Sequence, residues 1–214
     1  MSYEPKLAAA LTGATLRQLA HWRNPAAAKG ALLIPEVSAE RPILYSFRDL
    51  IALRLCVQMR KETSLHKIRD AVRSLRVNLG EREHLSTYRL VADGHHIYLV
   101  EPAQATDLLH GGNGVIHQVV DALKPFYRGG RHIPDLYQPR DHLRVDEDVR
   151  GGEPVIDGTR IPAADVAALV RDGIAPERIV DFYPGVSAAA ARDALDFSDY
   201  VDSYGNNEPR QGAA

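Results

Sequence analysis

The chain has 214 residues, 45% hydrophobic and 25% charged, a composition typical of a soluble globular protein with one or two domains. No apolar run reaches the roughly 18 to 20 residues of a membrane helix and no signal-peptide pattern is visible, so we expect a cytoplasmic protein without a membrane partner. The single cysteine, Cys56, excludes an internal disulfide and a thiolate zinc cluster within one chain. Its apolar neighbours indicate a buried structural thiol rather than a nucleophile.

The net charge of -2 conceals an uneven distribution. Residues 1–80 hold 13 Lys and Arg against 6 Asp and Glu, a net of +7, and the remaining residues carry a net of -9. A basic segment attracts the phosphate backbone of nucleic acids, whereas an acidic segment is repelled by it. Charge runs usually mark only a solvated face, but this asymmetry favours nucleic-acid binding by the N-terminal part.

A helix, a tight turn and a second helix are predicted between Lys6 and Arg23. Leu7, Ala10 and Leu11 follow the i, i+3, i+4 spacing of one helical face. Gly13 can adopt the positive φ that ends a helix, and Thr15 can cap the next one. Asn24-Pro25 then ends the second helix.

The second helix has a polar side suited to DNA. Arg17, Gln18 and His21 share the face opposite Leu16 and Leu19. In the major groove, Arg can pair with guanine and Gln with adenine. An ordinary surface helix in a helical hairpin explains the same pattern about equally well, because helix-turn-helix patterns are common by chance.

The next segment predicts a two-stranded wing and two further helices. Residues 31–35 and 43–45 are short extended candidates, with Arg41 near the tip between them. Ser46 and Asp49 have a capping-box spacing before a helix that is apolar on most sides, which we expect to be the buried central helix. Ser64 is expected to cap the following helix, and Gly80 to end it.

These motifs resemble the winged-helix DNA-binding domain of MerR-type regulators. The resemblance covers roughly residues 5–79 and rests on Leu11-Thr12-Gly13-Ala14-Thr15, Arg17, Leu19, Leu32-Leu33-Ile34-Pro35, Tyr45, Asp49-Leu50, Leu53, and Ser64-Leu65 with Ile68. It implies that Thr15, Arg17, Gln18 and His21 face DNA and that Arg41, Tyr45 and Arg48 approach its backbone. Arg23 and Lys29 complete the candidate DNA-binding set. The long dimerising coiled coil of that family is absent from this sequence.

A β-hairpin connector is predicted in residues 81–125. Alternating residues 88–91 and 96–100 flank Asp93-Gly94, a pair typical of a tight primed turn. His95 and His96 would point to opposite faces of a strand, so a metal site there is disfavoured. Gly111-Gly112-Asn113-Gly114 lacks the Lys-Ser/Thr ending of a phosphate-binding loop. We therefore expect no metal and no cofactor.

The last third of the chain predicts a linker and a small helical domain. Residues 126–142 are rich in Pro, Gly and charge without periodicity, which indicates an interdomain linker. Three short helices follow in residues 143–203. The run Gly152-Glu153-Pro154-Val155-Ile156-Asp157-Gly158-Thr159-Arg160-Ile161-Pro162, with Pro176-Glu177 and Tyr183-Pro184, resembles a small bacterial domain of the VapB-type antitoxin class, encoded beside PIN-domain ribonucleases.

The last predicted helix combines aromatic and acidic residues and leads into a polar tail. Phe197, Tyr200 and Tyr204 lie among four Asp residues, a mixture that favours a basic protein partner over DNA. Residues 204–214 are expected to be disordered alone. Arg210 is the tail residue that could compete with a cation in the carboxylate cluster of a PIN nuclease.

Together these patterns predict a two-domain α+β protein, mostly α. The expected function is that of a DNA-binding antitoxin that silences a PIN-domain ribonuclease toxin and, as a homodimer on operator duplex DNA, represses its own operon. The alternative is a MerR-like one-component regulator responding to a small effector. An enzyme using His84, His95, His96 or His110 is disfavoured, because the sequence has no nucleophile, base and orienting residue in a recognised order. We expect no catalytic residues.

Overall fold

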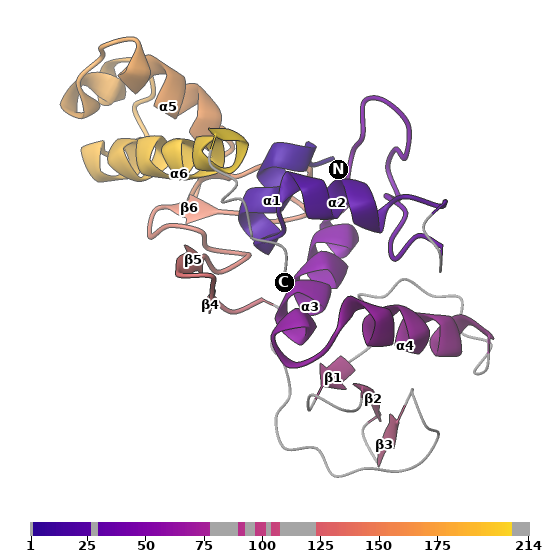
Figure 1. Cartoon of the computed structure of the whole chain (residues 1–214). Coiled ribbons are helices and arrows are strands. Elements are labelled where there is room, and N and C mark those ends of the chain that lie inside the picture. Colours follow the sequence, from indigo (N-terminus) through magenta and orange to yellow (C-terminus); the bar gives the residue numbers. More distant parts are fainter. Residues whose placement is uncertain are drawn as a thin grey trace.

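The computed structural model describes residues 2–26, 30–77, 90–92, 97–101, 104–107 and 123–206. Helices predominate, and the strands form small antiparallel sheets. This confirms the predicted α+β class with a majority of helix. Figure 1 shows the first helix between the central helix of the N-terminal part and the last helix of the chain.

The predicted helix, turn and helix are confirmed. Helix α1 spans Pro5–Thr12 and α2 spans Leu16–Trp22. Gly13 ends α1 with a φ of 75°, and its amide donates to the carbonyl of Ala9. The Thr15 hydroxyl accepts from the Gln18 amide at 3.1 Å, while the Gln18 side-chain oxygen accepts from the Thr15 amide at 3.0 Å. This reciprocal capping box fixes where α2 begins.

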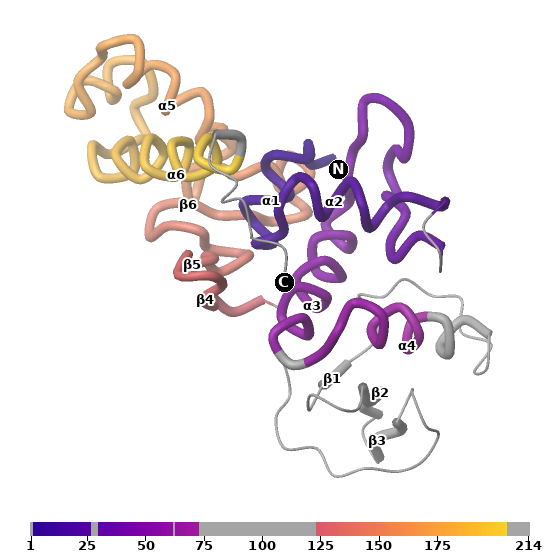
Figure 2. The backbone as a smooth tube through the Cα atoms, viewed as in Figure 1, coloured from indigo at the N-terminus to yellow at the C-terminus, as the bar shows by residue number. Residues whose placement is uncertain are grey.

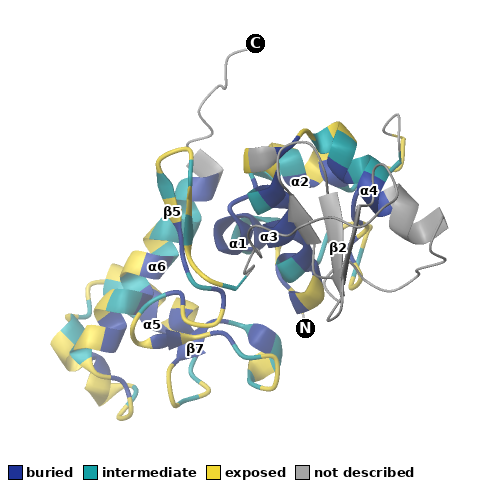
Figure 3. Ribbon diagram, turned by 90° about the horizontal axis from the view of Figure 1, so that it is seen from below, coloured by how far each residue is buried: buried dark blue, intermediate teal, exposed yellow. Residues whose placement is uncertain are grey.

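Two further helices complete the N-terminal part. Helix α3 spans Phe47–Glu62 and α4 spans Leu65–Val77. Ser46 and Asp49 form the expected capping box, and α3 is buried along most of its length. Cys56 lies inside this helix, where burial raises the pKa of its thiol to about 12, as expected of a structural thiol. Figure 3 shows α1 and α3 largely in dark blue, at the centre of this part.

The predicted wing differs from the observed loop. Leu32 and Leu33 form no strand. Their side chains are buried, and their amides donate to the carbonyl of Trp22 at the end of α2 instead of to a neighbouring strand. The two arms of the loop meet instead at Ser38 and Leu44, whose backbones exchange hydrogen bonds of 3.1 and 3.0 Å. The loop is therefore shorter than predicted, and it still carries Arg41 near its tip.

The two strands predicted for the connector hairpin pair with each other. Strands β1, Leu90–Ala92, and β2, Ile97–Glu101, run antiparallel with Ala92 opposite Ile97. A third strand, β3, Gln104–Asp107, pairs with β2 and was not predicted. Asp93-Gly94, the candidate histidines at 84, 95, 96 and 110, Gly80 and residues 111–114 lie outside the described residues.

The predicted linker is folded and packed. Strands β4, Phe126–Arg128, and β5, Arg131–Ile133, form a hairpin, and β6, Leu143–Arg144, pairs with β7, Val155–Ile156. Ile133 and Leu136 are buried. The strands are only two or three residues long, too short for an alternating pattern to be visible in the sequence. Figure 2 traces this segment from the end of α3 past α1 towards α6.

The C-terminal unit follows the prediction with two differences. Helix α5 spans Ala163–Arg171, the short helix η3 spans Pro176–Asp181, and α6 spans Ala188–Asn206. The Ser187 hydroxyl accepts from the Ala190 amide at 3.1 Å, as expected of a cap. However, η3 is a 3-10 rather than an α-helix, and α6 continues past the predicted end at residue 203. In the part of the chain that the structure describes, no helix is long and apolar enough to cross a membrane.

The N-terminal part and the C-terminal unit share one hydrophobic core. Helix α1 packs on α3 on one side and on α6 on the other. Gly13 lies so close to β5 that an added Cβ would be 2.9 Å from two side-chain carbons of Ile133. The two predicted domains are therefore packed against each other through α1 and the hairpin β4–β5.

Candidate nucleic-acid interface

Helix α2 presents one buried and one exposed face. Leu19 and Trp22 are almost fully buried, whereas Arg17, Ala20 and His21 are exposed. Buried side chains at i and i+3 fix the rotation of the helix, so the exposed residues have a defined direction. The predicted orientation of Arg17 and His21 is thus present in the structure.

Thr15 and Gln18 lie at the start of α2, where both side chains are used for capping. A bidentate contact to adenine needs both the oxygen and the nitrogen of the Gln amide. The Gln18 oxygen already accepts from the Thr15 amide. In this conformation Gln18 holds the helix start and does not present a complete amide edge.

Helix α4 adds a basic residue that was absent from the predicted set. A terminal nitrogen of Arg69 lies 3.3 Å from Nε2 of His21. Arg69 thus extends the polar face of α2 onto α4. The sequence places Arg69 on the polar side of an amphipathic helix, but that spacing gives no indication of which neighbouring helix the residue meets.

Two arginines of the predicted backbone-contacting set are exposed. Arg41 lies in the loop between Ser38 and Leu44, and Arg48 lies in the first turn of α3. The Arg48 guanidinium is 3.5 Å from the carboxylate of Glu36, which also accepts a 2.7 Å hydrogen bond from the Ser46 hydroxyl. This contact ties the loop to the start of α3.

Tyr45 does not belong to an exposed surface. It was expected to approach the DNA backbone, but only 1% of it is exposed, and its backbone pairs with Tyr3. Burial raises the pKa of the Tyr45 hydroxyl, and the neighbouring Arg23 guanidinium opposes this shift. Tyr45 is therefore a core residue, with Arg23 beside it. Lys29 lies outside the described residues.

The aromatic residues predicted to bind a toxin pack inside the protein. Phe197 and Tyr204 are buried, and the half-buried Tyr200 donates its hydroxyl to the carbonyl of Ala10 at 3.0 Å. Their i, i+3 and i+7 spacing turns all three towards the body of the protein. Sequence reasoning missed this, because an aromatic stripe looks the same whether its partner is internal or external. Arg210 lies outside the described residues.

Other apolar side chains of the C-terminal unit are exposed. Val180 and Phe182 are 47% and 49% exposed on and just after η3. We call this pair the η3 patch. Ile179 of η3 is buried, whereas Val180 and Phe182 remain outside the core.

The carbonyls at the end of α1 connect the two parts of the protein. The backbone carbonyls of Ala10, Leu11 and Gly13 accept from Tyr200, Arg54 and Arg128, in that order. The last carbonyls of a helix lack helical partners and carry partial negative charge, so donors and cations stabilise them.

Arg54 is the central donor of this connection. Its side chain is fully buried on α3 and also donates to the carbonyls of Pro134, Leu123 and Lys124. Its guanidinium lies 5.0 Å from the centre of the Phe126 ring. The end of α1 and the turn at Gly13 that leads to α2 are therefore held in place by residues from α3, α6 and the β4–β5 hairpin.

Two comparisons with known proteins gave a match, one to a family and one to a relative. Residues 144–198, from β6 into α6, match a family described as "Protein of unknown function (DUF433)". Over 71 residues the chain is 39% identical to the uncharacterized protein y4eO of Sinorhizobium fredii (strain NBRC 101917 / NGR234). The alignment covers 33% of this chain and 32% of that protein, so the chain spans about a third of the relative's length. No solved structure matches.

Proposed function

We propose that the protein is a DNA-binding antitoxin that represses its own operon and silences a PIN-domain ribonuclease. The observation that carries the DNA-binding part is the rigid, capped α2, whose exposed Arg17 and His21 point away from a buried Leu19 and Trp22. A helix with an apolar back and a basic front fits the major groove. Arg69 adds positive charge beside His21, and Arg41 is exposed on the loop that follows α2.

DNA binding of this kind requires two copies. One α2 of seven residues reaches too few bases for tight operator affinity. A two-fold dimer would place two such helices about 34 Å apart, or a multiple of it, on a palindromic operator. The connector sheet β1–β2–β3 is our candidate for the pairing element, because a small sheet has edge strands that gain from a partner.

The C-terminal unit is proposed to hold the toxin. The support is the antitoxin-like signature around Gly158, Thr159 and Arg160, together with the η3 patch. Exposed aromatic and branched aliphatic side chains on one short segment are the kind of apolar residues on which protein interfaces depend. We propose the η3 patch as the toxin-binding surface in place of Phe197, Tyr200 and Tyr204, which pack inside the protein.

Two measurements test the proposal. Fluorescence anisotropy should show tighter binding to the duplex upstream of the protein's own reading frame than to a scrambled duplex of equal length. Coexpression with the adjacent open reading frame should yield a complex whose ribonuclease activity is suppressed. Equal affinity for the two duplexes rejects the repressor role, and copurification of a small ligand instead of a protein favours the one-component regulator.

A further inference from the structure

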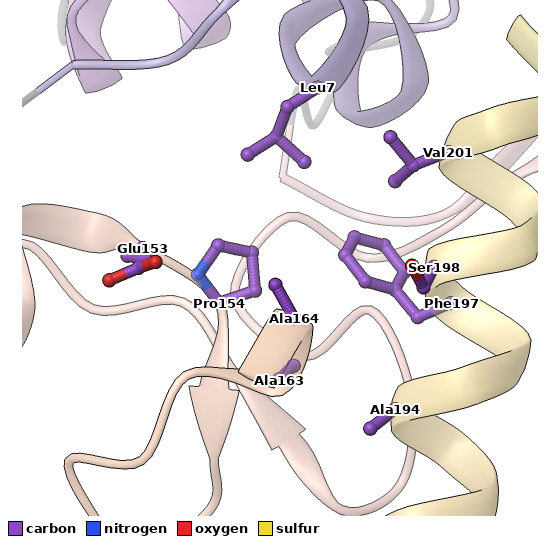
Figure 4. Close-up of a pocket in the computed structure, with 9 residues that line it drawn as sticks. All are labelled: Leu7, Glu153, Pro154, Ala163, Ala164, Ala194, Phe197, Ser198 and Val201. Carbon is purple, nitrogen blue, oxygen red and sulfur yellow. The ribbon is translucent and has the colours of Figure 1, made fainter. Parts of the chain in front are cut away.

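A small hollow lies where three separate parts of the chain meet. Its volume is about 150 Å³. Figure 4 shows the residues that line it. Leu7 of α1 closes it from one side, Pro154 and the start of α5 from another, and α6 from the third. The complete lining is Leu7, Glu153, Pro154, Ala163, Ala164, Ala194, Phe197, Ser198 and Val201.

The hollow exists because small residues face each other across a fixed junction. Ala163 and Ala164 of α5 and Ala194 of α6 carry only a methyl group each, so they leave the space beside the Phe197 ring unfilled. Polar contacts hold α1 and the C-terminal unit together around it. The Lys6 ammonium is 2.5 Å from the Asp202 carboxylate, and the Tyr3 hydroxyl donates to the Gly152 carbonyl at 2.7 Å. These contacts fix α1 relative to the C-terminal unit, so the two do not move together to fill the gap.

We propose that this hollow binds a compact apolar molecule, an aromatic ring or branched aliphatic group of about six to eight non-hydrogen atoms. The hollow has room for a molecule the size of benzene, and its mostly apolar lining would be removed from water when such a molecule binds. Ser198 is the uncharged polar residue of the lining. The Glu153 carboxylate is paired with the Arg150 guanidinium at 2.8 Å, so its charge is neutralised and the site does not select a cation.

The position of the site gives its ligand a structural consequence. A molecule in the hollow contacts Leu7 of α1 together with Phe197 and Val201 of α6. It therefore adds contacts between the part of the protein that carries α2 and the C-terminal unit. Bound ligand should stabilise this docking and raise the melting temperature, because it binds the docked form. The inference requires neither DNA binding nor a toxin, so either proposal can fail without the other.

The test uses benzene as the probe and glycerol, which has the same number of non-hydrogen atoms, as the polar control. Methyl NMR spectra of the full chain are recorded during titration with each compound, and melting temperatures are measured in parallel. Two variants accompany the wild type. Ala164→Leu fills the hollow from an exposed position on α5, and Ala168→Leu adds the same bulk one turn later, at an exposed position outside the lining.

The expected result is a saturable benzene shift for the methyl groups of Leu7, Ala163, Ala194 and Val201, with a rise in melting temperature. Ala168→Leu should behave as the wild type, Ala164→Leu should lose at least ten-fold in benzene affinity, and glycerol should give no saturable shift. The absence of saturation with benzene overturns the proposal. Benzene binding that survives unchanged in Ala164→Leu overturns it as well, because the ligand would then bind elsewhere.

Discussion

The Tyr3 hydroxyl donates a 2.7 Å hydrogen bond to the carbonyl of Gly152, 149 positions later in the chain. Tyr3 is 1% exposed, and burial raises the pKa of its hydroxyl. The segment before α1 is thus fastened to the turn before β7. Contacts such as this one join the N-terminal part and the C-terminal unit into one packed body.

Gly152→Ala should destabilise this contact. Gly152 has a φ of +82°, and an added Cβ would collide with the Tyr3 hydroxyl oxygen. Backbone strain should cost about 1 to 3 kcal/mol, and the lost hydrogen bond about 0.5 to 1.5 kcal/mol more. Urea unfolding measures the sum of these two losses in the free energy of unfolding. Gly158→Ala is the control, because its φ is +72° with no atom near the added Cβ. Equal losses in the two variants would show that the Tyr3 contact contributes nothing.

Arg54→Met should reduce stability by about 1 to 3 kcal/mol for each buried carbonyl left without a donor. The substitution keeps much of the apolar stem and removes every guanidinium donor, so the buried carbonyls of Leu11 and Pro134 lose their partner. Arg60→Met, exposed on the same helix, should change stability by less than about 0.5 kcal/mol. Denaturant midpoints of the two variants provide the comparison. A loss for Arg54→Met no larger than that for Arg60→Met contradicts its central role.

The contact of Lys6 with Asp202 should make stability depend on pH in the acid range. The hydrogen bond from Lys6 is the largest cause that holds the pKa of the Asp202 carboxyl below its usual 3.8, and the hydrogen bond from Arg171 acts in the same direction. A lowered folded-state pKa gives stability that is present above the unfolded value and is lost as the pH falls through the folded one. The free energy of unfolding, measured in urea, should therefore fall more steeply below about pH 4 for the wild type than for Asp202→Asn. Asp148→Asn, exposed on the loop before Arg150, is the matched control and should keep the wild-type slope.

Phe182→Ser should weaken toxin binding by at least about ten-fold, because a central aromatic anchor typically contributes that much to an interface. The measurement is calorimetric titration of the chain with the product of the adjacent open reading frame, the proposed toxin. Tyr127→Ser removes another exposed aromatic ring, 67% accessible on the hairpin β4–β5, and should leave the affinity unchanged. A larger effect at Tyr127 than at Phe182 would move the interface away from the η3 patch.

Local signals in the sequence predicted the helices well. Thr15, Ser46 and Ser64 each cap the helix that their spacing indicated, and Gly13 has the positive φ that its turn needs. These features depend on a few neighbouring residues, so the sequence contains all of the information. The fold class and the order of the helices follow directly from them.

Features that depend on distant partners were predicted less well. Tyr45 and Phe197 are aromatic residues whose burial depends on Tyr3 and on Arg140, far away in the sequence. The segment 126–142 lacks periodicity because its strands are very short, although Ile133 fills the space left by Gly13. Hydrophobic patterning detects apolar residues that recur at a regular spacing along a helix or strand. Each of these contacts involves a single residue, so no such pattern reveals it.

The affinity of Arg17→Ala for duplex DNA tests the central claim most directly. If Arg17 pairs with guanine, the variant should lose on the order of 1 to 3 kcal/mol, about 5-fold to 150-fold in affinity, on the operator and little on a scrambled duplex. Arg41→Ala should weaken binding to both duplexes alike, and Arg178→Ala, exposed in the C-terminal unit, should weaken neither. Identical affinity of wild type and Arg17→Ala for the operator would contradict base reading by α2.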